Sequence, residues 1–222
     1  MNTKAFIAEF IGTFTLVFVG VGAIAGNHIN GGQTGLLGIA MAHGLAIATM
    51  VAATAAISGG HLNPAVTIAM LVTKKIDGVN ATGYVIAQCL AGIAAAVFVK
   101  ICFAGEVLAA VGMGTPALAD GVGVGAGLLM EIVLTFFLVF VIYGAAVDKR
   151  GPATAPLFIG LAVAMDILIG GPVTGAAMNP ARHLGPALLG GGLQNFWLYW
   201  VGPVAGGVLA GLLYNSTLLE QK

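Results

Sequence analysis

Long apolar stretches separated by short polar or glycine-rich segments dominate this chain. Six stretches come close to the length of about 20 residues that a helix needs to cross a bilayer. They lie at roughly 5–25, 35–57, 81–103, 124–147, 155–171 and 195–215, and the fifth is the shortest. The pattern predicts an all-α membrane protein with six transmembrane helices.

Two further apolar stretches, Pro64–Val72 and Pro180–Leu189, are too short to cross the membrane. A helix rises about 1.5 Å per residue, so each would cover only about half of a hydrocarbon core of about 30 Å. Each stretch begins at an Asn-Pro pair, which suits a helix start because Asn caps free N–H groups and Pro fits the first turn. We therefore expect two re-entrant half-helices that meet end to end and together make one span.

The second half of the chain repeats the first. A Glu-x3-Thr-x2-Leu-Val-Phe-Val pattern begins at Glu9 and again at Glu131, and Asn-Pro-Ala begins at Asn63 and again at Asn179. Three spans per copy is an odd number, so the copies must cross the bilayer in opposite senses. We expect a single transmembrane channel domain over residues 1–222, with repeat one at about 1–104, repeat two at about 122–222, and its working site near the midplane.

Composition and charge agree with a lipid-facing surface. Hydrophobic residues make up 59% of the chain and charged residues 7%, whereas soluble domains carry about 25% charge. The net charge of zero gives no indication of a nucleic-acid partner. Six of the eight basic residues fall on one predicted face, which predicts that both termini are cytoplasmic: Lys4, Lys74, Lys75, Lys149, Arg150 and Lys222.

Glycine-rich segments precede the two Asn-Pro-Ala sites, and we expect non-helical backbone there. Non-helical backbone at membrane depth is tolerated only where it is buried in protein or lines a wet cavity. We therefore expect these segments to line an aqueous path, through Gly59, Gly60, His61, Gly175, Ala177 and Met178. At its midplane the amide hydrogens of Asn63 and Asn179 and the positive ends of two helix dipoles would repel cations and hold a neutral water. Nothing predicts a cofactor, a metal site or a catalytic residue, so transport would be passive.

Two Asn-Pro-Ala boxes in inverted halves, the second continuing into Arg182, resemble the aquaporin (major intrinsic protein) family over nearly the whole chain. The resemblance implies a water channel that assembles as a homotetramer and excludes ions and protons. It also implies a selectivity filter outside the boxes, formed here by His43, Ile167, Ala176 and Arg182. This set is similar to that of plant vacuolar-membrane aquaporins, which as a group also pass ammonia, urea or hydrogen peroxide.

Glycerol facilitators of the same family are the nearest alternative. They resemble one another in having Asp after the filter arginine and a basic residue four positions later, where this chain has His183 and Ala187. We expect His183 to face solvent or to brace a loop, and Asp166 to brace residues 170–179. The short terminal segments resemble those of prokaryotic members, which favours a prokaryotic cytoplasmic membrane.

Two other classes of function remain as alternatives. An inverted-repeat secondary transporter would bind its coupling ion at the intramembrane carboxylates Glu9 and Glu131. Their matched positions favour a scaffold role instead, in which they accept N–H bonds from the two half-helix loops. An intramembrane hydrolase using Ser58 and His61 would need an orienting acid, and the sequence places none beside them.

Overall fold

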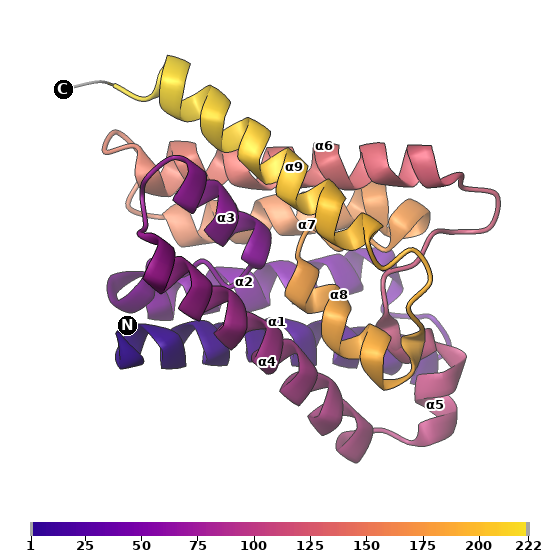
Figure 1. The fold of residues 1–222 in the computed structure, drawn as a ribbon. Coiled ribbons are helices and arrows are strands. Elements are labelled where there is room, and N and C mark those ends of the chain that lie inside the picture. The colour runs from indigo at the N-terminus through magenta and orange to yellow at the C-terminus, as the bar shows by residue number, and fades with distance from the viewer. Residues whose placement is uncertain (1, 221–222) are drawn as a thin grey trace.

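The computed structural model describes residues 2–220, which fold into a bundle of long helices (Figure 1). The six predicted spans are confirmed as α1 (Thr3–Ile29), α2 (Gly35–Ser58), α4 (Gly78–Cys102), α6 (Val124–Ile142), α7 (Ala155–Thr174) and α9 (Leu198–Leu213). Helices α6 and α9 each continue into one wider turn, Tyr143–Val147 and Tyr214–Leu218. The fifth span is longer than its apolar run suggested, because α7 continues through Pro172 to a left-handed cap at Gly175.

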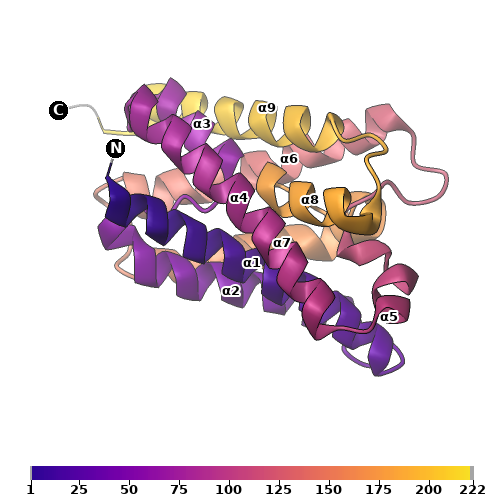
Figure 2. The same cartoon turned by 60° about the horizontal axis from the view of Figure 1, so that its bottom comes forward.

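The two half-helices, α3 (Pro64–Val72) and α8 (Pro180–Pro186), start near the middle of the bundle and point away from each other (Figures 1 and 2). Each is capped by its asparagine, as predicted: Asn63 Oδ1 accepts from the backbone N–H of Ala65 at 2.8 Å, and Asn179 Oδ1 accepts from that of Ala181 at 3.0 Å. Helix α8 ends earlier than predicted, because the chain continues into a wider turn and three consecutive glycines at 190–192.

Each half-helix packs against the third span of the other half of the chain. In α4, Gly92 lies against the carbonyl oxygen of Ala181 in α8, so closely that a side chain there would collide with it. In α9, Gly207 lies against Ala65 of α3, and a Cβ at Gly207 would be 3.3 Å from the carbonyl oxygen of Ala65. Small residues thus let backbones approach at equivalent points of both repeats.

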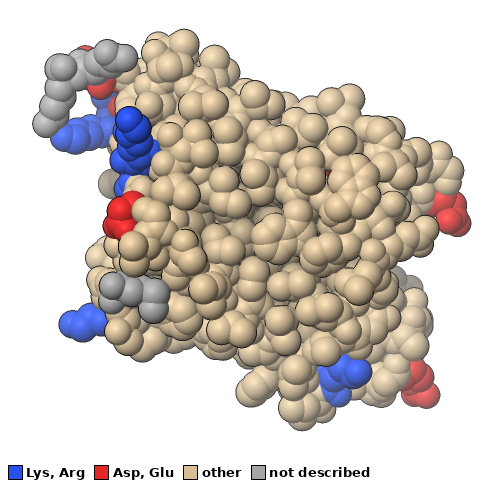
Figure 3. All heavy atoms as spheres, in the orientation of Figure 1, with Lys and Arg blue, Asp and Glu red and all other residues tan. Residues whose placement is uncertain are grey.

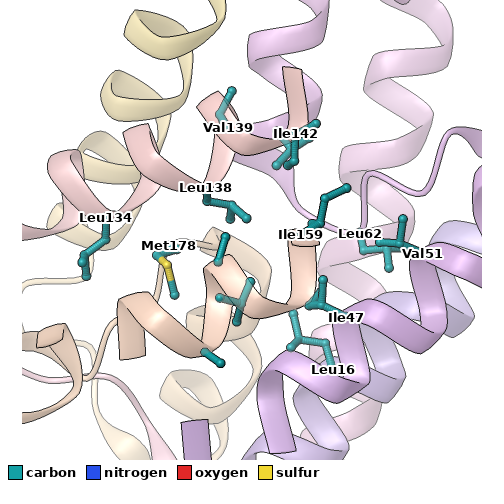
Figure 4. Packing of buried hydrophobic residues seen from close by; sticks show 14 of the residues in the cluster. Leu16, Ile47, Val51, Leu62, Leu134, Leu138, Val139, Ile142, Ile159 and Met178 are labelled. Atoms are coloured by element: carbon teal, nitrogen blue, oxygen red, sulfur yellow. The ribbon is translucent and has the colours of Figure 1, made fainter. Parts of the chain in front are cut away.

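Much of the interior between the spans is apolar (Figure 4). Buried side chains from four spans converge there: Leu16 of α1, Ile47 of α2, Leu138 of α6 and Ile159 of α7. The outer faces are apolar as well: Ile101 is 74% exposed and Leu37 is 62% exposed. Large apolar residues in contact with the surroundings on this scale indicate a surface that faces lipid.

Charged side chains lie at the ends of the bundle, with an uncharged band between them (Figure 3). The end that carries the chain termini also carries the only ion pair among residues 2–220, in which Arg150 Nε donates to Asp148 Oδ1 at 2.9 Å. Arg150 also donates to the carbonyl oxygen of Leu218 at 2.9 Å, and its guanidinium holds the pKa of Asp148 well below the usual range. Lys222, which the charge pattern assigned to this end, lies outside the described residues.

At the opposite end, the long loop between α4 and α6 contains structure that the apolar pattern did not predict. It forms the short helix α5 (Gly105–Ala110) and a single tight turn at Gly112–Gly114. Lys100, at the end of α4, reaches across to donate to the carbonyl oxygen of Leu189 at 3.2 Å. The turn at Gly112–Gly114 also packs against the segment Ala187–Gly191 that follows α8, so the loop and this segment lie together at this end.

The contact at Gly92 can be tested by substitution. We expect Gly92→Ala to lower the free energy of unfolding by about 1–3 kcal/mol, because the added methyl group forces α4 away from the α8 backbone. Gly78→Ala, in the same helix but with open space around it, should be neutral or stabilising by up to about 1 kcal/mol. Thermal unfolding of both purified variants in detergent measures this, and equal behaviour of the two would contradict the packing.

Candidate functional site

The carboxylate of Glu9 organises the loop before α3. It is fully buried in α1, and its oxygens accept hydrogen bonds from the hydroxyl of Ser58 at 2.6 Å and the backbone N–H groups of His61 and Leu62 at 2.9 and 2.6 Å. Gln88 of α4 donates a further bond at 2.8 Å. A buried carboxylate is stable only with such a set of donors, and here the donors include the loop backbone itself.

Glu131 of α6 does the same for the loop before α8. It is also fully buried and accepts from the hydroxyl of Thr174 at 2.7 Å and the backbone N–H groups of Ala177 and Met178 at 2.9 and 2.8 Å. The two arrangements match residue by residue, apart from the glutamine. The scaffold arrangement expected from the sequence is therefore present in the geometry of both halves.

This arrangement decides which backbone groups face the interior of the path. The N–H groups of each loop turn toward a carboxylate, so the carbonyl groups turn the other way. Among residues 2–220, no hydrogen bond reaches the carbonyl oxygens of residues 59–61 or 175–177. Positive φ angles make this possible, at 86° for Gly59 and 52° for Leu62, and at 78° for Gly175 and 51° for Met178. Each half thus offers a short row of unpaired acceptors.

The two asparagine side chains join the halves at the centre. Asn63 Nδ2 donates to the carbonyl oxygen of Met178 at 2.8 Å, and Asn179 Nδ2 donates to that of Leu62 at 2.9 Å. Each amide has two hydrogens, so one hydrogen of each remains for another partner. The sequence predicted donors at this point but not that one hydrogen of each pair is already used.

The residues expected to form the constriction come together around a small cavity. The volume of this cavity is about 20 Å³. Its lining includes the two asparagines and the four expected filter residues, His43, Ile167, Ala176 and Arg182. A single water needs roughly 10–15 Å³ measured in this way. Water would therefore pass this point one molecule at a time.

Two contacts position Arg182 in this cavity. Its Nη1 donates to the carbonyl oxygen of Gly114 at 2.8 Å, and its Nη2 lies 3.4 Å from His43 Nε2. His43 Nδ1 is 2.8 Å from the carbonyl oxygen of Ile39, which can only accept. The histidine hydrogen therefore lies on Nδ1, and Nε2 presents a lone pair to the guanidinium.

A larger cavity of about 230 Å³ lies on the side of the chain termini. Its floor is Gly59, Gly60, His61 and the amide of Asn63, which lines both cavities. Ala177 and Met178 line the small cavity. Gly175, the remaining residue expected to line the path, lines neither cavity and instead packs against Pro116 of the outer loop.

Several supporting residues were missed in the sequence. Tyr84 and Tyr199 donate to the carbonyl oxygens of Ser58 and Thr174, both at 2.9 Å, and the repeat could have revealed this pair. Nothing in the sequence indicated that the carbonyl oxygen of Gly114 binds Arg182, because every residue type has the same backbone oxygen.

Two further polar side chains are buried. His183 does not face solvent: it is fully buried, stacks on Tyr199 with ring centres 4.2 Å apart, and has no side-chain hydrogen bond. Asp166 is 1% exposed, and its Oδ2 has no partner, so this oxygen does not brace residues 170–179. The expectation that His183 faces solvent is therefore wrong, and the bracing role of Asp166 stays a prediction, because sequence position contains no information on the direction of a side chain.

The geometry opposes the enzymatic alternative. The hydroxyl of Ser58 donates to Glu9 and accepts from the N–H of Gly60 at 3.1 Å. The His61 ring bonds to Thr67 at 3.2 Å rather than to Ser58. The structure therefore lacks the serine–histidine pair that the hydrolase alternative requires, and Glu9, the acid beside Ser58, also accepts the N–H groups of the loop.

Removing one carboxylate tests the loop scaffold. We expect Glu131→Ala to lower the free energy of unfolding by about 2–4 kcal/mol, because two buried N–H groups and a hydroxyl lose their charged acceptor. Glu106→Ala, at an exposed position on α5, is the matched control and should change stability by less than about 0.5 kcal/mol. Thermal unfolding of both variants measures this; wild-type stability in Glu131→Ala would rule out the scaffold.

Comparison with known proteins agrees with this architecture. The Major intrinsic protein family matches residues 1–214. The chain is 45% identical to aquaporin TIP4-4 of Zea mays, over 98% of this chain and 88% of that protein. It is 44% identical to the probable aquaporin TIP2-2 of Oryza sativa subsp. japonica, over 96% of this chain and 87% of that protein. The X-ray structure of the aquaglyceroporin from Plasmodium falciparum is similar with a TM-score of 0.86 and 26% identity, covering 98% of this chain and 97% of that one. The chain is therefore a multi-pass membrane protein that belongs to the major intrinsic protein family.

Proposed function

We propose that the chain is a passive channel for water that also admits small neutral solutes such as ammonia or urea. One observation carries this proposal: the two cavities share Asn63 in their linings, and between them they contain the free carbonyls, the asparagine pair and Arg182. Such a path offers hydrogen bonds to a neutral molecule at each step. The names of the plant relatives, which are aquaporins, support the same function.

Ions and protons would be excluded at two places. At the asparagine pair, the N-terminal ends of α3 and α8 together direct partial positive charge at the path, and the free amide hydrogens hold a water by its oxygen. A water held in this way donates outward on both sides, which interrupts a proton-conducting chain. Arg182 adds a full positive charge at the outer cavity, as in other pores of this type.

The outer cavity would act as the selectivity filter. His43 and Arg182 supply its polar side, while Ile167 and Ala176 supply an apolar side. An apolar wall orients water less strictly than a polar one, so other small neutral molecules can pass. Its volume of about 20 Å³ favours water over glycerol, and the chain has neither the aspartate nor the basic residue expected of a glycerol facilitator.

The rest of the proposal concerns assembly and location. We infer a homotetramer with one pore in each chain, both termini on the cytoplasmic side, and repeats at about 1–104 and 122–222. The family supports the assembly, and the basic residues at the end with the termini support the orientation. The plant relatives give no support to a prokaryotic cytoplasmic membrane, which stays a prediction from the sequence.

Osmotic measurements test the channel. Vesicles that contain the purified protein should shrink several-fold faster under a sucrose gradient than empty vesicles, with a low activation energy, because the permeant moves along pre-formed hydrogen-bond partners. The rate should not depend on sodium or on a proton gradient, which separates a channel from an ion-coupled transporter. Shrinkage no faster than that of empty vesicles would refute water conduction.

The filter assignment is tested by exchanging its first two positions. We expect the double variant His43→Phe/Ile167→His to lower the permeability ratio of urea to water by about tenfold, because it narrows the cavity and adds a polar group to its apolar side. Stopped-flow measurements with water, urea and ammonia give the ratios. Leu161→Phe, at an exposed position on α7, serves as a control and should keep them. Unchanged ratios in the double variant would remove these residues from the filter.

A further inference from the structure

The path is strongly asymmetric in width. The inner cavity, about 230 Å³, is more than ten times larger than the outer one, about 20 Å³. By the measure in which a single water needs roughly 10–15 Å³, the inner cavity has room for about fifteen waters or more. A wide space that ends at a single-file constriction can admit molecules that are unable to pass through.

The wall of the inner cavity is apolar and uncharged. It is formed by apolar side chains from four helices: Ile47 and Val51 of α2, Met70 of α3, Ile142 of α6 and Ile159 of α7. None of the residues that line it carries a formal charge, and all of them belong to the described part of the chain. A charged guest would lose its hydration here without a compensating partner, so the cavity selects neutral molecules.

The floor of the cavity consists mainly of hydrogen-bond acceptors. The carbonyl oxygens of Gly59, Gly60 and His61 have no partner among residues 2–220. The hydroxyl of Thr67 lies 3.0 Å from the carbonyl oxygen of Asn63 and 3.2 Å from His61 Nδ1, and when its hydrogen is on the carbonyl it accepts from Nδ1. His61 Nε2 is then another acceptor. A guest with a donor group fits this floor better than one with acceptors alone.

We propose that the inner cavity is a binding site for neutral organic molecules of roughly ten non-hydrogen atoms, with an apolar body and one hydroxyl donor, such as alkylated phenols. The apolar body lies against the wall, and the hydroxyl donates to the carbonyl row on the floor. Pockets of this kind are mostly apolar with a few placed polar groups. A guest of this size binds with a dissociation constant of about 0.1–1 mM.

A bound molecule stops the flow of water in both directions, because the outer cavity is too small to let it leave and it covers the carbonyl row that water uses. This part of the inference rests on the proposed channel function. Binding itself does not, so it can be measured separately.

Thymol and thymol methyl ether provide a matched pair of probes. They have nearly the same apolar body, but the ether cannot donate a hydrogen bond. We expect about 1 mM thymol to reduce the protein-dependent shrinkage of vesicles by half or more, and the ether to have a much weaker effect. Empty vesicles treated with each probe measure the contribution of the bilayer.

Two variants narrow the cavity without touching its floor. Ala146 and Ala55 line it and are exposed, so Ala146→Phe and Ala55→Phe should lose the thymol block, measured as the fraction of each variant's own water flow that thymol removes. Ala109→Phe, at an exposed position on α5 near the opposite end, should be blocked like the wild type. Equal effects of thymol and its ether on the wild type would overturn the proposal, as would an unchanged block in whichever narrowed variant folds.

Thermal unfolding in detergent separates this inference from the channel function. Thymol should raise the unfolding temperature of the wild type more than its ether does, and this difference should disappear in Ala146→Phe. If vesicles with untreated protein conduct no water, the channel function fails, and the unfolding difference alone decides on binding. If they conduct water but thymol changes neither the flow nor the unfolding temperature, the binding site is refuted and the channel remains.

Discussion

Backbone groups that leave a helix inside a membrane need partners, and in this protein each of two glutamates accepts two N–H groups of a loop. Each carboxylate accepts the N–H groups of one loop, so that only the carbonyl groups are left to face the path. The same bonds that make the loops stable therefore give the path its row of acceptors. The hydrogen bonds that stabilise each loop thus also orient the carbonyl groups on which the proposed permeation depends.

The remaining features of the path follow from how the two loops meet. Because each loop leads into a capped half-helix, two positive dipole ends lie at the centre, where the asparagine amides also present hydrogens. Arg182 lies only three residues after the cap of α8, and for this reason it reaches the outer constriction. The inner side has no such cation, and its wall is formed by the apolar faces of spans whose packing keeps a wider space open.

The sequence predicted the fold well because its signals were long and repeated. Three signals were informative: the length of the apolar spans, the two Asn-Pro helix starts, and the matched positions of Glu9 and Glu131. The residue types in these signals have few other roles inside a membrane. Predictions were poorer where a backbone atom or a side-chain direction decided the outcome. Three features depend on three-dimensional packing that composition and spacing do not encode. They are the contact of Arg182 with the carbonyl oxygen of Gly114, the burial of His183 and the unpaired oxygen of Asp166.

The two central amides each bind a carbonyl of the opposite repeat, and each half-helix rests on the opposite third span. A single repeat would consequently have neither a partner for its asparagine nor a surface for its half-helix. If the chain descends from a protein of half its length, that ancestor needed two copies inserted in opposite orientations to make one pore. Fusion into one chain would remove the need for such dual insertion and let the two sides differ, as they do where Arg182 follows one Asn-Pro-Ala box and Val66 stands at the matched position after the other.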